Sequence, residues 1–76
     1  MPRNIRKERR AAELTIEQVA DLVGVHPNTV RGWEKGEYEP TGKNLVQLST
    51  LFGCAADYLL DLTDDRNGVA VARREI

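Results

Sequence analysis

The fold of this 76-residue chain is most constrained by residues 15–36, TIEQVADLVGVHPNTVRGWEKG. Thr15 and Gln18 have the spacing of a capping box, in which two side chains satisfy free backbone N–H groups at a helix N-terminus. The helix that they open, 16–23, is expected to end at Gly24, because glycine takes the left-handed conformation without strain from a Cβ. The pattern therefore predicts a short helix followed by an abrupt turn.

A second predicted helix, 27–35, follows closely on this turn. Pro27 suits its first turn, because proline has no N–H to leave unpaired and its φ is already helical. Val30 and Trp33 form the inward stripe of this helix, and Val25 is expected to wedge into the turn. The apolar face of the first helix is expected to consist of Val19, Ala20, Leu22 and Val23. The two helices are therefore predicted to pack against each other.

The second helix is predicted to turn a polar face outward. The residues on that face are Asn28, Thr29, Arg31 and Gly32. Asparagine can bond adenine bidentately and arginine can do the same to guanine, so this face carries the chemistry for base reading in the major groove. We expect Gly32, which lacks a side chain, to allow close approach of the phosphate backbone or of a thymine methyl. Residues 15–36 are thus predicted to form a DNA-reading helix-turn-helix.

The spacing of these residues resembles that of a known family. The chain carries T-x-x-Q-V-A-x-x-x-G-V-x-x-x-T-V-x-x-W-E-x-G, which is similar to the Xre/Cro-type phage repressor domain. Pro40, then LVQLSTLFG, then DYLL are similar to the fourth and fifth helices of that family, so the resemblance covers roughly residues 3–62. It implies an all-α, lambda-repressor-like five-helix bundle, usually a dimer, that binds operator DNA as a repressor or regulator. It also implies a structural ion pair between Arg9 and Glu34.

The remaining helices are predicted from caps and apolar spacing. A charged first helix, 3–12, is expected to turn Ile5, Arg9 and Ala12 inward. Thr41 can cap a fourth helix, 42–52, that ends at Gly53. Its apolar residues have the period of an amphipathic helix and are Leu45, Leu48, Leu51 and Phe52. Helices are therefore predicted before and after the helix-turn-helix in the chain, and together with it they form one bundle.

The end of the chain is expected to divide into a last helix and a tail. A short fifth helix, 56–61, offers Tyr58, Leu59 and Leu60 to the bundle. Because so small a bundle leaves Tyr58, Leu60 and Leu62 hard to bury together, we expect the segment 55–62 to form the surface of a homodimer. The predicted domain spans residues 1–62, and the turn-rich segment 63–76 is predicted to be a C-terminal tail.

Contacts with the DNA backbone are expected at helix N-termini, where free N–H groups face phosphates. The residues placed there are His26, Pro27, Lys43 and Asn44. His26 is interpreted as a cap or a phosphate neighbour. Ile16 cannot bond phosphate and is expected to pack on the second helix of the motif or on a thymine methyl. Tyr38 has two open interpretations, a contact with the sugar-phosphate edge or a cover over the neighbouring helix.

Composition limits the other classes of function. Cys54 is the single cysteine and His26 the single histidine, so neither an intramolecular disulfide nor a metal site is predicted. We predict no enzyme, no cofactor and no small-molecule ligand, because no nucleophile, base or metal cluster is present. The chain has no signal-like apolar region and no run long enough to span a bilayer, and a cytoplasmic location is expected.

The net charge of −1 is low for a DNA-binding domain. Basic residues dominate 3–10, whereas 57–65 carries four aspartates and no basic residue. The binding face can be positive if the acidic end lies away from it. Two functions follow: a sequence-specific regulator that binds a palindromic operator as a homodimer, or an antitoxin-like module of the same fold whose main partner is a protein docked on 57–65.

Overall fold

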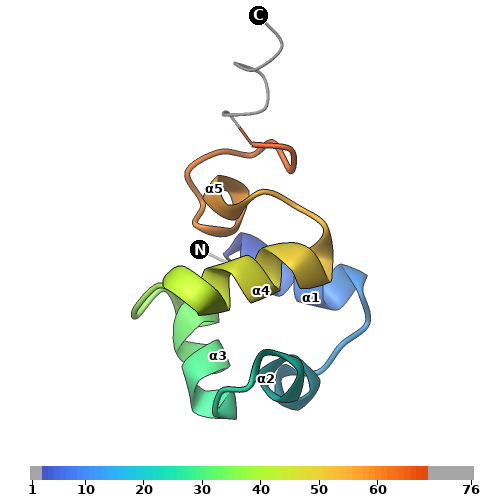
Figure 1. The fold of residues 1–76 in the computed structure, drawn as a ribbon, viewed down its shortest axis with the longest axis vertical. Helices are drawn as coiled ribbons and strands as arrows, with labels where there is room; N and C mark the ends of the chain where they lie inside the picture. The colour runs from blue at the N-terminus through green and yellow to red at the C-terminus, as the bar shows by residue number, and fades with distance from the viewer. Residues whose placement is uncertain (1–2, 69–76) are drawn as a thin grey trace, which may run out of the picture.

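The computed structural model describes residues 3–68 and is all-helical over that range (Figure 1). The helices are α1 (Asn4–Ala11), α2 (Ile16–Val23), α3 (Pro27–Lys35), α4 (Gly42–Phe52) and α5 (Ala56–Leu59). The predicted five-helix architecture is therefore confirmed. None of these helices combines the length and the apolar character that crossing a bilayer requires.

Each helix contributes at least one buried side chain to a single core. The buried apolar residues are Ile5, Val19, Ala20, Val23, Val30, Trp33, Leu48, Cys54, Tyr58 and Leu59. Trp33 and Tyr58 are the largest of the fully buried side chains. The inward position predicted for Trp33 is confirmed, and Cys54 is buried in the same core. This shared core holds α2 and α3 at a fixed relative position.

The inward face of α1 differs from the prediction. Ile5 is buried, but Ala12 is an exposed C-cap residue just beyond the helix, so its predicted inward position is wrong. Glu8 takes the inward position, three residues after Ile5, and only 8% of its surface is exposed. A carboxylate in such a place requires partners, because an unpaired buried charge is strongly unfavourable.

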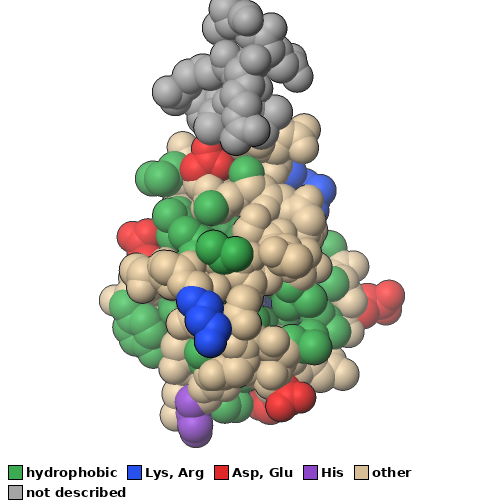
Figure 2. All heavy atoms as spheres, in the orientation of Figure 1, with side chains coloured by type: hydrophobic (Ala, Val, Ile, Leu, Met, Phe, Trp, Pro, Cys, Tyr) green, Lys and Arg blue, Asp and Glu red, His purple; other side chains and the backbone are tan. Residues whose placement is uncertain are grey.

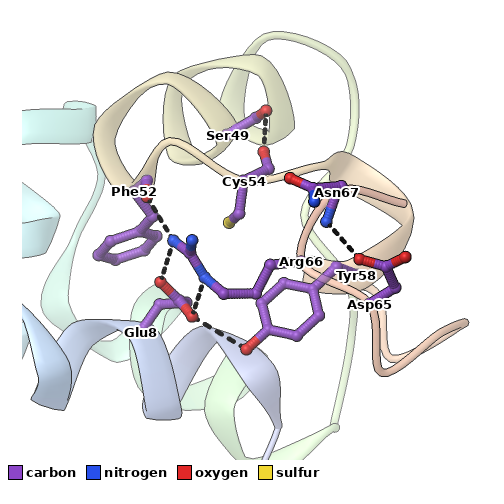
Figure 3. Close-up of polar contacts among 8 residues, drawn as sticks. All are labelled: Glu8, Ser49, Phe52, Cys54, Tyr58, Asp65, Arg66 and Asn67. Carbon is purple, nitrogen blue, oxygen red and sulfur yellow. Dashed lines mark hydrogen bonds and ion pairs between the residues drawn. The ribbon is translucent and has the colours of Figure 1, made fainter. Parts of the chain in front are cut away.

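Glu8 finds its partners in residues far along the chain (Figure 3). Arg66 donates to both of its carboxylate oxygens at 2.8 Å, and the Tyr58 hydroxyl donates to Oε2 at 2.9 Å. The hydrogen bonds from Arg66 hold the pKa of Glu8 below its ordinary value, against the opposing effect of burial. Burial, together with the bond to Glu8, raises the pKa of Tyr58 to about 12. The buried charge is thereby paired on two sides.

The segment 63–68 packs on the bundle. The Arg66 guanidinium also donates to the Phe52 carbonyl at 2.9 Å, and the Arg66 carbonyl accepts from the Ala55 N–H at 2.8 Å. The domain boundary predicted after residue 62 therefore cuts through a set of hydrogen bonds to α1, α4 and the start of α5. The rest of the predicted tail, 69–76, lies outside the described residues.

One apolar residue of α2 does not join the core. Leu22 is 57% exposed, so its predicted place in the buried face is wrong. It lies beside the buried stripe and lines a groove between α2 and α4, opposite the exposed Val46. Figure 2 shows hydrophobic side chains on the face of the molecule that carries α4. The buried stripe of α2 is therefore narrower than predicted, since it consists of Val19, Ala20 and Val23 without Leu22.

The last helices differ from the prediction in two details. Thr41 is the N-cap residue of α4, but its side chain makes no capping hydrogen bond. The helix α5 ends earlier than expected, since Asp61 adopts a left-handed φ of 62° and accepts the Asn4 N–H at 2.8 Å. Tyr58 and Leu59 are buried and Leu60 is half-buried, whereas Leu62 is 71% exposed. The apolar surface that remains on 55–62 is consequently smaller than predicted.

Candidate nucleic-acid interface

Local hydrogen bonds fix both ends of α2, the first helix of the helix-turn-helix. The Thr15 hydroxyl accepts the Gln18 N–H at 3.0 Å and the Gln18 side chain accepts the Thr15 N–H at 2.8 Å, so the predicted capping box is formed. Gly24 has a φ of 83°, and its N–H and that of Val25 both donate to the Ala20 carbonyl. This left-handed glycine ends α2 and lets the chain enter α3 within a few residues.

The start of α3 is capped by a histidine. The Nδ1 atom of His26 accepts the Asn28 N–H at 3.0 Å, and Pro27 occupies the first turn. The capping interpretation of His26 is confirmed. With Nδ1 accepting, the Nε2 edge of the exposed ring is directed away from this bond. His26 and Pro27 therefore stand at the exposed, electropositive end of α3, where an anion is favoured.

The outer face of α3 is mostly, but not wholly, the one predicted. Asn28 is exposed, and Thr29 and Arg31 are partly exposed. Gly32 is buried, so its predicted outward exposure is wrong. The physical reason is the ring of Tyr38, which lies where a Cβ on Gly32 would be. Of the two interpretations left open for Tyr38, the structure supports the cover over a helix.

The polar side chains on this face bind one another. Arg31 donates to the Asn28 side-chain oxygen at 2.8 Å and forms an ion pair with Glu17 of α2 at 3.0 Å. The Arg31 and Glu17 side chains are 42% and 64% exposed, so solvent screens their attraction. Glu17 is a member of the site that sequence reasoning missed. Its position in the first turn of α2 gave no signal, because an acid there is also explained by the helix dipole.

The Arg9–Glu34 ion pair joins α1 to the last turn of α3. Arg9 Nε lies 2.6 Å from Glu34 Oε2 and Arg9 Nη2 lies 3.1 Å from Oε1, while Nη1 donates to the Leu14 carbonyl at 2.9 Å. The hydrogen bond to Glu34 raises the pKa of Arg9. This bidentate geometry is the strong form of such a pair, and it sets the angle of α3 relative to α1.

A pocket with a mainly basic lining lies beside this ion pair. It is lined by Arg6, Arg9, Ile16, Arg31, Glu34 and Lys35. Sequence reasoning did not place Arg6 and Lys35 in the site. Arg6 and Arg9 are three residues apart and lie on one side of α1, and this spacing could have indicated a basic surface. Lys35 reaches the pocket only because α3 packs beside α1, which the sequence alone does not show. Ile16, which cannot bond phosphate, is half-buried against the core.

Lys43 and Asn44 lie in the first turn of α4, shortly after the end of α3. Lys43 is exposed and Asn44 is partly exposed. The acidic segment 57–65 begins within α5, which lies at the opposite end of the molecule from α2 and α3 (Figure 1). Within it, Asp61 also pairs with Arg3 at 3.2 Å. The acidic charge is thus separated from the outer face of α3, as a positive binding face requires.

Comparison with known proteins supports the helix-turn-helix architecture described above. The Helix-turn-helix family profile matches residues 5–59. The chain is 38% identical over 61 residues to the uncharacterized HTH-type transcriptional regulator YobD of Bacillus subtilis, covering 80% of this chain and 54% of YobD. It is 37% identical over 60 residues to repressor protein C2 of Salmonella phage P22, covering 79% and 28%. No solved structure gives a significant match.

A third relative is the HTH-type transcriptional regulator DicA of Escherichia coli, 34% identical over 62 residues, with 82% of this chain and 46% of DicA covered. The chain therefore spans about half or less of the length of these relatives. The residues that the family profile matches cover α2 to α5 in full and α1 from its second residue. The chain belongs to the helix-turn-helix family.

Proposed function

We propose that this chain is the DNA-binding domain of a transcriptional regulator, most simply a repressor, that inserts α3 into the major groove. The observation that carries the proposal is the exposed Asn28–Arg31 face on a helix whose orientation is fixed by α2 and by the Arg9–Glu34 pair. The names of the relatives, two transcriptional regulators and a phage repressor, support the same function. The protein acts in the cytoplasm, where its DNA is, and performs no catalysis.

The proposed roles follow from exposure and chemistry. Asn28, Thr29 and Arg31 read base edges, since their side chains leave α3 on its outer face. Gly32 is buried and contributes no side chain, and the space beside it is occupied by the Tyr38 ring. The backbone is held at the helix N-termini by His26, Pro27, Lys43 and Asn44.

The functional unit is a homodimer on a palindromic site. Two α3 helices related by a two-fold axis would enter successive major grooves ~34 Å apart. The exposed Leu62, at the end of the segment 55–62, supports a contact on that side of the molecule. Sedimentation of the protein alone and on a full site tests the stoichiometry, and a monomer on a full site contradicts it.

Selection of bound sites from a random duplex pool at controlled salt tests the function. We expect a palindromic consensus whose binding weakens as salt rises, because phosphate contacts release counterions. Recovery of unrelated sequences at every salt concentration contradicts sequence-specific binding.

The alternative is a protein-interaction module of the same fold, such as an antitoxin. The exposed groove lined by Leu22 and Val46 favours it, because large apolar side chains are solvent-facing there. Retention on DNA without any partner separates the two functions. A chain that binds duplex DNA only after a partner is added supports the alternative.

A further inference from the structure

Tyr38 lies against α3 although it belongs to the loop that follows the helix. Its hydroxyl donates to the backbone carbonyl of Asn28 at 3.2 Å, and its ring covers Gly32. Asn28 and Gly32 are four residues apart, so they lie one above the other on the same side of the helix. The tyrosine ring therefore runs along the side of α3 that carries the proposed base-reading residues.

The glycine at position 32 is explained by this ring. A Cβ on Gly32 would lie 2.6 Å from Tyr38 Cε1 and would collide with Cζ and Oη. The colliding atoms are the far end of a side chain, so an alanine there would displace the ring and leave the helix in place. Gly32 thus makes room for an aromatic side chain supplied by another part of the chain.

The other side of the ring remains available for contacts. Tyr38 is 48% exposed, although its hydroxyl and one ring edge are held against α3. A tyrosine fixed in this way offers a rigid apolar surface at a low entropic penalty on binding. In the major groove, the matching apolar group is the C5-methyl of thymine, which distinguishes A·T from G·C pairs.

We propose that Tyr38 is a base-reading residue of this domain, whose ring replaces the side chain that Gly32 lacks and packs against a thymine C5-methyl. This inference deepens the proposed function and rests on it. It adds a specificity-determining residue from a loop to a set that otherwise comes from α3. Sequence reasoning could not place it, since the contact of residues 32 and 38 depends on the path of the loop.

The experiment compares four proteins on the wild-type consensus site obtained by selection: wild type, Tyr38→Ala, Tyr38→Phe and Gly32→Ala. We expect Tyr38→Ala to bind this site ~5–30-fold more weakly and to lose preference at one base position per half-site. Gly32→Ala should lose preference at the same position, because it displaces the ring. Tyr38→Phe should retain the preference, because it keeps the ring.

A thymine-to-uracil substitution at that position removes only the C5-methyl from the DNA. It should weaken wild type and Tyr38→Phe several-fold, and leave Tyr38→Ala unchanged, since the ring and the methyl are one interaction. Val46→Ala is the control for removing an exposed apolar side chain away from α3, and it should leave the consensus unchanged. Far-ultraviolet circular dichroism verifies that each variant keeps its helices.

Several outcomes would overturn the inference while leaving the proposed function intact. Unchanged affinity in Tyr38→Ala would make the residue a cover alone. Equal weakening on all duplexes, with a smaller salt dependence, would assign it to phosphate. Equal losses in Tyr38→Phe and Tyr38→Ala would assign the effect to the hydroxyl. If wild type selects no sequence at all, the proposed function fails first and this inference fails with it.

Discussion

The Arg9–Glu34 pair is the contact most open to a quantitative test, because it joins α1 to α3 through two hydrogen bonds. The two side chains are 13% and 7% exposed. Removing one member of a fully buried pair costs ~3–5 kcal/mol, and an exposed pair contributes only ~0–1 kcal/mol. With exposures near the buried limit, Arg9→Ala should lower the free energy of unfolding by ~2–4 kcal/mol.

The structure also predicts an asymmetry between the two substitutions. Arg9→Ala leaves the Glu34 carboxylate nearly buried without its partner, whereas Glu34→Ala leaves Arg9 with its hydrogen bond to the Leu14 carbonyl. Glu34→Ala should therefore cost less, ~1–3 kcal/mol, since a satisfied donor loses less than an orphaned charge. Lys7→Ala is the matched control, because Lys7 is an exposed basic residue of the same helix.

Urea unfolding of wild type, both single variants and the double variant measures these values. The double variant should lose less than the sum of the single losses by ~1–3 kcal/mol, because the two changes delete one shared interaction. In thermal melts, each kcal/mol corresponds to ~4–8 °C for a domain of this size. Strict additivity would refute the coupling, and a larger loss for Glu34→Ala than for Arg9→Ala would refute the argument from burial.

Four further predictions concern DNA binding and pH. Asn28→Ala should weaken specific binding by ~1–3 kcal/mol and relax one base position per half-site in a competition assay, whereas equal weakening on all sequences would assign Asn28 to phosphate. Lys43→Ala should weaken binding to all duplexes nearly equally and reduce the salt slope by about one, and an unchanged slope would remove Lys43 from the interface. Glu17→Gln should tighten binding to a random duplex ~2–10-fold at low salt, because it releases the charge of Arg31, and unchanged non-specific affinity would argue against that role. The pKa of Tyr58 is raised from 10.0 to about 12, so the stabilisation of the fold by the protonated Tyr58 hydroxyl is complete below pH 10 and is lost as pH rises through about 12. Unfolding at pH 9–12 should show a loss of about 2 kcal/mol that Tyr58→Phe lacks, and identical pH profiles would contradict the assignment.

Local signals in the sequence were sufficient for the helix-turn-helix itself. The capping box at Thr15, the left-handed Gly24 and the early proline of α3 each act within a few residues, so their effect does not depend on the rest of the fold. The inward positions of Val30 and Trp33 follow from helical periodicity in the same way. These are the reasons why the motif and its class of function could be predicted.

The Arg9–Glu34 contact came from family resemblance, and the structure contains it. The roles of the proposed base and backbone contacts remain predictions. For these residues, the sequence determines the chemistry of the side chains and their place on a helix. Their contacts with bases depend on how the domain docks.

The tertiary structure decided which side chains are covered, because burial depends on segments that meet only after folding. Gly32 was predicted to be exposed, yet Tyr38 from the next loop lies over it. Glu8 was not predicted to be buried, yet Arg66, 58 positions later, supplies the charge that makes its burial possible. Helical periodicity identifies the faces of a helix, whereas the packing of other segments determines which face is covered and which remains available to a ligand.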